Sequence, residues 1–425
     1  MLLELYLKNN NSDLKSMHIQ TKIPMTTIRD INKRELARWN ISYFDAIAKT
    51  IGKNRLVVMK ELEELNKIKD VINSMGKYNL ENRRYIGNKS KLLNWISSIM
   101  NQYTKGESFM DVFAGTGVVT QSMLPKYKKL IINDFLFSNN IIYKAFFGNE
   151  NYDIEKMKDY QARYQKIETN SVDDNYFHDN FGGKFFSEKD AKIIGEIRTR
   201  IERDEKLNER ERAILIASLL YSSDKIANTV GHYDAYRKNT KIEDKFVFEL
   251  INPINTLSKD IEIYRKDANQ LVREVKADVA FIDPPYNSRQ YSRFYHVLEN
   301  IAKWEKPDLY GVAMKPAPEN MSDYSRTSAP RVFDDLVTNI DAKYIVVTYN
   351  NTYTSKSNSS RNKITHEEII KSLNKVGKTR SFEKPFQYFN AGKTNLVGHK
   401  EYVFITEVRK WFKWNFLVTS KSLEK

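Results

Sequence analysis

The stretch Phe109-Met-Asp-Val-Phe-Ala-Gly-Thr-Gly117 passes from an apolar run into a glycine-containing turn, and a helical pattern follows. This order predicts a buried strand, a tight turn and a helix that begins at the turn. Gly115 and Gly117 permit a tight turn and a close approach of the backbone to a ligand. The stretch is not a Gly-x-Gly-x-x-Gly motif, and no Gly-Lys-Ser/Thr follows as in a phosphate loop. Taken alone, its two glycines fit a purely geometric role equally well.

Four further apolar runs predict buried strands, and helical patterns lie between them. The runs are KKLIIND (128–134), ADVAFIDPPY (277–286), AKYIVVTYN (342–350) and KEYVFITEV (400–408). Alternating strands and helices predict a doubly wound α/β sheet with a ligand at the carboxyl ends of the strands. Asp134 ends the second run, where an acidic residue can accept hydrogen bonds from ribose hydroxyls or can cap the next helix.

The segment Ala280-Phe-Ile-Asp-Pro-Pro-Tyr286 carries the clearest chemical signal. Two adjacent prolines cannot donate ladder hydrogen bonds, so the strand must stop there on a stiff backbone. Asp283 and the carbonyl of Pro284 offer acceptors without donors, and Tyr286 offers a flat face for stacking. This set suits the exocyclic amino group of a planar base, with rate enhancement through positioning and electrostatics. The alternative is a turn that merely ends a strand.

Composition narrows the class of protein. The 425 residues include 69 Lys and Arg against 54 Asp and Glu, a net charge of +15 that favours a polyanionic partner. Cysteine is absent, which excludes disulfides, Cys-x-x-Cys zinc sites and thiol nucleophiles. The six histidines are scattered along the chain, so we expect no metal site. No apolar run is long enough for a membrane span or a signal peptide, so we expect a cytoplasmic protein without a membrane partner.

Residues 1–78 differ in pattern from the rest of the chain. LKSMHIQ, MTTIRDINK and ISYFDAIAKTIG predict three short helices, the first capped by Ser12 or Asp13 and ended by TKIP. A short helix, a tight turn and another helix is the helix-turn-helix layout, and the stretch resembles phage-repressor-type DNA-binding domains. A helical bundle used for dimerisation is the alternative. Residues 55–78 predict one charged connector helix.

Residues 140–258 interrupt the α/β pattern. This segment is rich in charge and in helix-forming residues, and it is too long for a simple crossover between strands. We therefore expect a mainly helical lobe inserted at residues 140–258, with the α/β domain formed by residues 79–139 and 259–425.

The motifs together resemble one family. Arg84-Tyr-Ile-Gly-Asn-Lys-Ser-Lys-Leu-Leu93 precedes FAGTG, Asp134 follows it, and DPPY comes last. This order is similar to that of Dam-like, alpha-group DNA adenine methyltransferases of the restriction-modification type, over about residues 83–408. The resemblance implies a Rossmann-like domain that binds S-adenosylmethionine, with the 140–258 lobe as the target-recognition region. The lobe and the N-terminal extension depart from Dam, so its target site is not carried over.

The resemblance also implies roles for individual residues. Asp283, Pro284, Pro285 and Tyr286 would grip the target adenine, and Asp283 would also face the cofactor. Asp134 would hold the ribose hydroxyls, and Asp267 in YRKDA would hydrogen-bond the cofactor adenine, although Asp267 also fits a helix cap. The other implied cofactor contacts are Tyr85, Gly87, Lys89 near the carboxylate, Phe113, Ala114, Gly115 and Gly117.

Methylation of a paired base requires its extrusion from the duplex. NSRQYSRFYH (287–296) follows DPPY and interleaves basic and aromatic residues, of which Arg289, Arg293 and Tyr295 are candidate DNA contacts. A partly buried helix face explains this pattern equally well.

The leading hypothesis is a site-specific adenine methyltransferase acting on double-stranded DNA, with a cognate restriction endonuclease as a possible partner. A methyltransferase acting on the cytosine ring is excluded, because that chemistry needs a cysteine nucleophile. The alternatives are an RNA base methyltransferase and a DNA-binding regulator built on a methyltransferase scaffold.

Overall fold

The computed structural model describes residues 2–10, 12–229, 231–256, 258–285, 288–351, 361–385 and 399–409. The chain forms two compact units, Met1–Gly76 with Asn252–Asn255, and Lys77–Ile251 with Thr256–Lys425. Within the described ranges, every helix is too short or too polar to cross a membrane.

The first unit is helical. Its elements are α1 (Leu2–Asn9), α2 (Leu14–Thr21), α3 (Met25–Ile31), the short 3-10 helix η1 (Leu36–Arg38), α4 (Ile41–Ile51) and α5 (Arg55–Met75). Asp13 caps α2 by accepting a hydrogen bond from the Ser16 amide at 2.6 Å. Met17, Ile28 and Ile47 meet in its core. The helices expected over LKSMHIQ, MTTIRDINK and ISYFDAIAKTIG are therefore present, whereas α1 is an additional helix.

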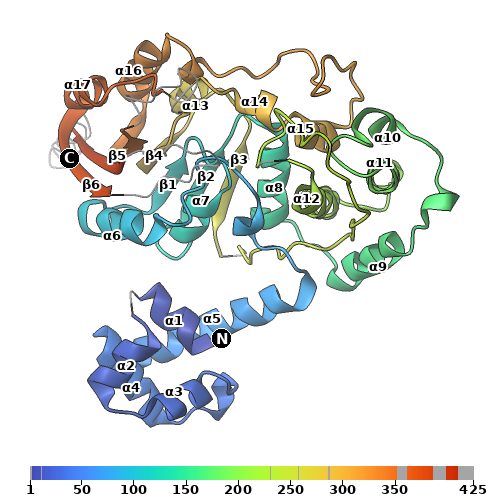
Figure 1. The fold of residues 1–425 in the computed structure, drawn as a ribbon. Coiled ribbons are helices and arrows are strands. Elements are labelled where there is room, and N and C mark those ends of the chain that lie inside the picture. The colour runs from blue at the N-terminus through green and yellow to red at the C-terminus, as the bar shows by residue number, and fades with distance from the viewer. Residues whose placement is uncertain are drawn as a thin grey trace, which may run out of the picture. The chain divides into compact units, whose positions relative to one another are not determined.

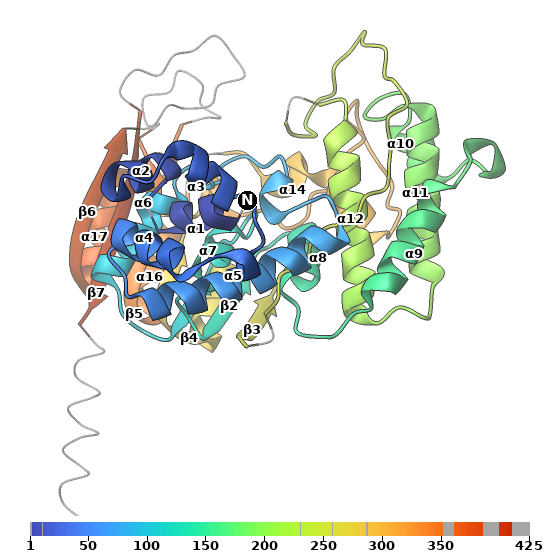
Figure 2. The ribbon, with the colours of Figure 1, turned by 90° about the horizontal axis from the view of Figure 1, so that it is seen from below.

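The second unit is built on a seven-stranded sheet in the order β3-β2-β1-β4-β5-β7-β6 (Figures 1 and 2). The first five strands of this order are parallel, and β7 runs antiparallel to both β5 and β6. The strands are β1 (Ser108–Asp111), β2 (Lys129–Asn133), β3 (Asp260–Tyr264), β4 (Lys276–Ile282), β5 (Asp341–Asn350), β6 (Gly377–Pro385) and β7 (Lys400–Val408). The five expected strands are confirmed. The edge strands β3 and β6 escaped prediction because charged residues interrupt their apolar pattern.

Helices cover both faces of the sheet. On one face Phe109 and Phe281 pack against α6 (Leu93–Tyr103) and α7 (Val118–Met123). On the other face Met110 and Ala280 pack against α13 (Ala268–Glu274), α16 (Ala329–Asn339) and α17 (His366–Val376). Neighbouring residues of one strand thus enter opposite cores, as the two-residue period of a strand requires.

Between β2 and β3 the chain forms a run of helices, drawn in green in Figure 1. They are α8 (Phe137–Phe147), α9 (Ile154–Gln165), α10 (Tyr176–Phe181), α11 (Glu188–Arg203) and α12 (Glu209–Ile226). α8 lies between the sheet and α9–α12 (Figure 1). The buried Arg198 of α11 donates hydrogen bonds to the carbonyls of Ile301 at 2.7 Å and Ala302 at 3.3 Å, which anchors α11 to α15 (His296–Lys303).

Asp278 in β4 joins the amino ends of the central strands. Its Oδ2 accepts hydrogen bonds from the amides of Glu107 at 2.7 Å and Ser108 at 3.0 Å, and Lys343 of β5 pairs with Oδ1 at 2.6 Å. Partial burial opposes ionisation, but the bonds from Lys343 and from these amides outweigh it, and the pKa of Asp278 is lowered.

We expect Asp278→Asn to destabilise the second unit by about 1–3 kcal/mol at pH 7, because charge-assisted hydrogen bonds are lost. A carboxylate with a lowered folded-state pKa stabilises the fold above its unfolded pKa of about 3.9 and loses this contribution as the pH falls. The difference in melting temperature between wild type and variant should therefore shrink below about pH 4. Thermal melts from pH 3 to 8 measure it, and a difference that grows on acidification would contradict the assignment.

Candidate active site

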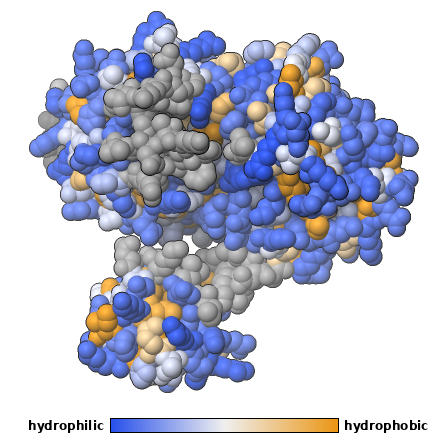
Figure 3. Space-filling model, in the orientation of Figure 1, coloured by the Kyte–Doolittle hydropathy of each residue, from blue (hydrophilic) through white to orange (hydrophobic). Residues whose placement is uncertain are grey.

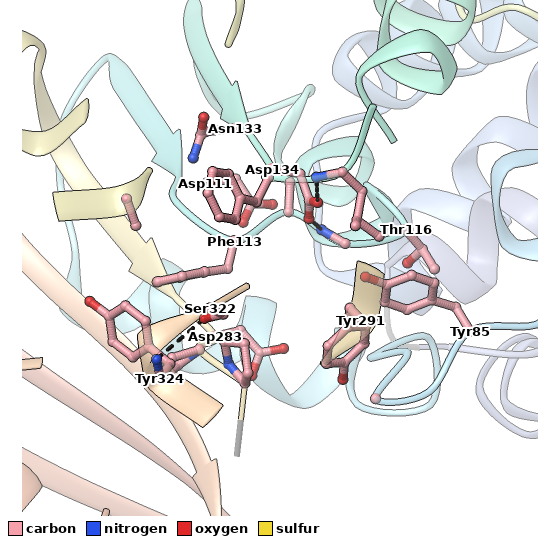
Figure 4. Close-up of a pocket in the computed structure, with 18 of the residues that line it drawn as sticks. Tyr85, Asp111, Phe113, Thr116, Asn133, Asp134, Asp283, Tyr291, Ser322 and Tyr324 are labelled. Carbon is pink, nitrogen blue, oxygen red and sulfur yellow. Dashed lines mark hydrogen bonds between the residues drawn. The ribbon is translucent and has the colours of Figure 1, made fainter. Parts of the chain in front are cut away.

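The carboxyl ends of the five parallel strands meet at one edge of the sheet, and four of them carry a carboxylate at or shortly after that end. Asp111 ends β1, Asp134 follows β2, Asp267 lies between β3 and α13, and Asp283 follows β4. All four line one pocket with about 990 Å³ of space, its open mouth included (Figure 4). The sheet order therefore gathers side chains that are up to 172 positions apart in the sequence.

The glycine turn after β1 forms the floor of this pocket. The Ala114 amide donates a hydrogen bond to the carbonyl of Asn133 at 2.9 Å, which holds the turn against β2. Gly115 has φ +54°, and a Cβ there would lie 3.3 Å from the ring of Tyr85. Gly117, at φ +79°, packs against Leu80, Tyr143 and Phe147 and is outside the pocket lining. Gly117 thus serves the geometry of the turn, and Gly115 keeps the pocket open.

Asp134 holds the glycine turn in place. Its Oδ2 accepts a hydrogen bond from the Gly115 amide at 2.9 Å, and Oδ1 accepts one from the Leu136 amide at 2.9 Å (Figure 4). Burial raises the pKa of Asp134 to about 6, and these amide bonds limit the rise. Asp134 also lines the pocket.

Asp283 is held from two sides. Lys89 pairs with its Oδ2 at 2.8 Å, and the hydroxyl of Thr348 in β5 donates to Oδ1 at 2.7 Å. Both side chains of the ion pair are largely buried, with 6% of Lys89 and 16% of Asp283 exposed. Pro284 and Pro285 extend from Asp283 along the pocket wall. The structure thereby brings the GNK stretch near position 88 against the DPP stretch, although 194 positions separate Lys89 from Asp283.

Stacked tyrosines form another wall. Tyr85 stacks on Tyr295 with ring centroids 4.8 Å apart, and its ring centroid lies 5.3 Å from that of Tyr291. Tyr85 and Tyr291 line the pocket, and Figure 4 shows them on the side opposite Tyr324. Gly87 lies next to them at φ +83°, where a Cβ would lie 3.4 Å from the Tyr291 hydroxyl.

Asp267 combines two of its expected features. It is the N-cap of α13 and accepts hydrogen bonds from the amides of Asn269 at 3.0 Å and Gln270 at 3.2 Å. It also lines the pocket, beside Phe113 and Tyr324, whose rings meet edge to face with centroids 5.0 Å apart. The carboxylate is therefore held rigidly and still faces the cavity.

The pocket brings most of the predicted cofactor and adenine contacts together. Those that line it are Tyr85, Gly87, Lys89, Phe113, Ala114, Gly115, Asp134, Asp267, Asp283, Pro284 and Pro285. Tyr286 lies outside the described residues. The roles assigned to these residues stay predictions.

The three predicted DNA contacts lie beside the pocket and do not line it. Arg289 lies with its guanidinium 5.8 Å from the Phe294 ring centroid, and Arg293 donates a hydrogen bond to the carbonyl of Pro316. Tyr295 is fully buried, and its hydroxyl accepts a hydrogen bond from the Ile86 amide at 2.9 Å. In this structure Tyr295 supports the Tyr85 loop from within the protein.

Sequence reasoning missed several pocket residues. Gln290 and Ser322 exchange a pair of hydrogen bonds at 2.8 and 2.9 Å and close the pocket together with Tyr324. Ser322 and Tyr324 follow a long irregular segment after α15, where no periodic pattern marks them. Only their folded position identifies them.

Asp111 is the most informative residue that was missed. Its side chain is 1% exposed, Oδ2 accepts a hydrogen bond from the Thr120 hydroxyl at 2.7 Å, and Oδ1 has no partner among the described residues. Burial, together with the charges of Asp283 and Asp134, raises the pKa of Asp111 to about 7. Its position at the end of the glycine-turn strand was an available signal.

Comparison with known proteins adds to this geometry. The family model for D12 class N6 adenine-specific DNA methyltransferases matches residues 85–351, more than half of the chain. The chain is 33% identical over 289 residues to modification methylase LlaI of Lactococcus lactis subsp. lactis, an alignment covering 63% of this chain and 46% of LlaI.

Two other relatives align over almost their whole lengths. Type II methyltransferase M.NlaIII of Neisseria lactamica is 29% identical over 348 residues, covering 76% of this chain and 98% of M.NlaIII. Type II methyltransferase M.CviAII of Paramecium bursaria Chlorella virus 1 is 30% identical over 341 residues, covering 77% and 98%. The chain thus spans about half the length of LlaI and nearly all of the other two.

We expect Asp111→Asn to raise the melting temperature relative to wild type by roughly 2 °C or more at pH 8, and by less at pH 5. A carboxylate whose folded pKa lies above its unfolded value of about 3.9 costs stability as the pH rises toward the folded pKa. The asparagine removes this cost and can still accept the Thr120 bond. Melts at both pH values test the expectation, and an equal shift at the two would refute it.

Proposed function

Since the chain belongs to the D12 class N6 adenine-specific DNA methyltransferase family, we propose that it methylates the exocyclic amino group of an adenine in a specific duplex DNA sequence. The methyl donor would be S-adenosylmethionine, and the adenine would be flipped out of the duplex. The relatives named as modification methylase and type II methyltransferases support a role in a restriction-modification system, with a cognate endonuclease as partner.

The observation that carries this proposal is the clamp on Asp283. Thr348 and Lys89 each bind one oxygen of its carboxylate, so the side chain cannot rotate away from the stiff Pro284-Pro285 backbone. A fixed carboxylate beside a fixed carbonyl can accept both hydrogens of an adenine amino group. The reaction is thereby favoured by positioning and preorganised charge.

The pocket suits the proposed donor. Its other carboxylates, at Asp111, Asp134 and Asp267, match the hydroxyl and amino groups of S-adenosylmethionine, and Lys89 matches its carboxylate. The buried Asp111 Oδ1, without a partner among the described residues, is an acceptor that a bound amino group would satisfy. When bound, S-adenosylmethionine supplies a methyl group on a positively charged sulfur.

The chain's own residues act on the amine. Hydrogen bonds to Asp283 and to the Pro284 carbonyl localise the lone pair of the adenine N6, which is otherwise delocalised into the ring. A bond forms from N6 to the methyl carbon, the bond from carbon to sulfur breaks, and its electron pair stays on sulfur. N6 then loses one proton, for which Asp283 is the adjacent acceptor.

We assign the parts of the chain accordingly. Residues 79–139 and 259–425 would form the catalytic domain in the motif order of the Dam-like alpha group, and residues 140–258 the target-recognition lobe. The exposed Arg237, Lys238 and Lys241 on that lobe support a contact with phosphates. Arg289 and Arg293 stay candidates for the same role.

We expect Asp283→Ala to lower methyl transfer at least a hundredfold, since the acceptor for the amine is lost. Purified protein is incubated with radiolabelled S-adenosylmethionine and mixed genomic DNA, with total RNA in a parallel tube, and digested nucleosides are analysed for methyladenine. Asp341→Asn, an exposed carboxylate at the opposite end of the strands, is the matched control.

The outcomes separate the candidate functions. Label in DNA adenine that is lost only in Asp283→Ala supports the proposal. Label confined to RNA would make the protein an RNA base methyltransferase, and no label in either would favour a DNA-binding regulator.

The first unit supports a second function, sequence-specific DNA binding. α2 and α3 are joined by a three-residue turn in which Lys22 adopts φ +62°, and Ile28 and Ile31 of α3 are buried. The opposite face of α3 exposes Thr26 and Arg29. We assign residues 1–78 as a helix-turn-helix domain with a connector helix, and α3 as the helix that enters the major groove.

We expect Arg29→Ala combined with Lys33→Ala in the full chain to weaken binding to the DNA that precedes its own coding sequence by about tenfold. Gel-shift titration measures it. Lys49→Ala with Lys60→Ala removes the same charge from exposed positions of α4 and α5 and serves as control. Equal losses of affinity in both double variants would indicate that the unit binds DNA only through non-specific electrostatic attraction.

A further inference from the structure

A small hairpin projects from the segment between α15 and the 3-10 helix η4 (Asp323–Ser325). Tyr310 and Lys315 exchange two backbone hydrogen bonds, at 2.8 and 3.0 Å, and these close a four-residue turn. Gly311 at φ +71° and Met314 at φ +50° permit the tight reversal. The hairpin is therefore a defined structure within an otherwise irregular segment.

Two apolar side chains of this hairpin are exposed, one at its base and one in its turn. Tyr310 is 63% exposed and Val312 is 66% exposed, more than any other large hydrophobic residue described in the second unit. The surrounding segment carries the exposed charged residues Lys306, Asp308 and Glu319. Figure 3 shows a mainly hydrophilic surface on which hydrophobic side chains occur in small separate groups. Two neighbouring exposed apolar side chains on a projecting turn suggest a binding role.

The turn of the hairpin and the residue that follows it are fixed to elements beside the active-site pocket. His296 Nε2 lies 2.7 Å from the carbonyl of Ala313, and Arg293 of α14 (Tyr291–Phe294) donates to the carbonyl of Pro316. Tyr291 and Ser292 of the same short helix line the pocket. Asn320, which follows the hairpin, also lines the pocket. It comes five residues after Lys315, so the chain between these two residues spans at most about 18 Å.

An ion pair between Lys315 and Asp234 joins the hairpin to the loop of residues 231–241. That loop exposes Arg237, Lys238 and Lys241, and His232 in it stacks on Phe294 with ring centroids 4.6 Å apart. Two exposed apolar side chains and a basic loop are therefore held together beside the pocket. This combination suits the duplex around an extruded base, where phosphates lie outside and stacked bases inside.

We propose that the Tyr310–Lys315 hairpin enters the duplex at the target adenine, and that Tyr310 and Val312 fill the space left by the extruded base. Extrusion costs stacking and pairing, and an apolar group that replaces the lost stacking stabilises the extruded state. The inference rests on the proposed function. It assigns that function a part of the chain outside the DPPY segment and outside residues 140–258.

The test compares two substrates. The target sequence is first mapped by sequencing DNA methylated by the wild type, and oligonucleotide duplexes are made with the target adenine either paired or opposite an abasic site. We expect Tyr310→Ser combined with Val312→Ser to lower methylation of the paired duplex about tenfold or more, and to recover most activity on the abasic duplex. Tyr310→Phe should retain activity on both.

Leu56→Ser, which removes an apolar side chain of α5 that is 70% exposed, is the matched control and should not distinguish the substrates. Equal losses of the double variant on both duplexes, or no loss on either, would overturn the proposed insertion of the hairpin. If the wild type methylates neither duplex, the proposed function fails. A second measurement reports extrusion directly, through the fluorescence of 2-aminopurine placed at the target position. An equal rise with wild type and double variant, or no rise with the wild type, would also overturn the proposed insertion of the hairpin.

Discussion

The parallel order of five strands forces several carboxylates into one small volume, and the site depends on how their repulsion is offset. Asp134 and Asp267 are each bound by two backbone amides, and Asp283 by Thr348 and Lys89. Asp111 accepts a hydrogen bond from the Thr120 hydroxyl, and burial raises its pKa to about 7. The pocket thus holds acceptors in fixed directions, and of the two lysines in its lining, Lys89 and Lys266, Lys89 pairs with Asp283.

That lysine connects two segments whose roles otherwise look separate. Lys89 lies in the loop that contains Tyr85, whose ring stacks on Tyr295. Its ammonium group pairs with the carboxylate of Asp283. A ligand that forms an ion pair with Lys89 would therefore weaken the electrostatic interaction between Lys89 and Asp283. Under the proposed function, binding of the methyl donor at Lys89 and the charge state of Asp283 as adenine acceptor would be coupled through this side chain.

The sequence predicted those features that depend on local patterns. Five apolar runs became strands. Asp134 was found at the end of one of them and Asp283 in the DPPY segment that ends another, whereas Asp267 was named only through the family resemblance, since β3 before it was not predicted. It could not reveal contacts made by irregular chain, such as Ser322 and Tyr324, since no periodicity marks them. The burial of Tyr295 could not be predicted either, because it lies in a stretch that also carries Arg289 and Arg293, and its ring is nevertheless enclosed.

The two outer strands of the sheet carry opposite charge. β3 exposes Asp260 at one edge of the sheet, with Glu262 half-buried beside it, and β6 exposes Lys378, Arg380 and Lys384 at the other. Unpaired edge strands invite strand addition by other chains, and charged side chains raise the cost of forming the dry, flat contact that such addition needs. The residues that hid β3 and β6 from pattern analysis thus protect the folded protein against aggregation.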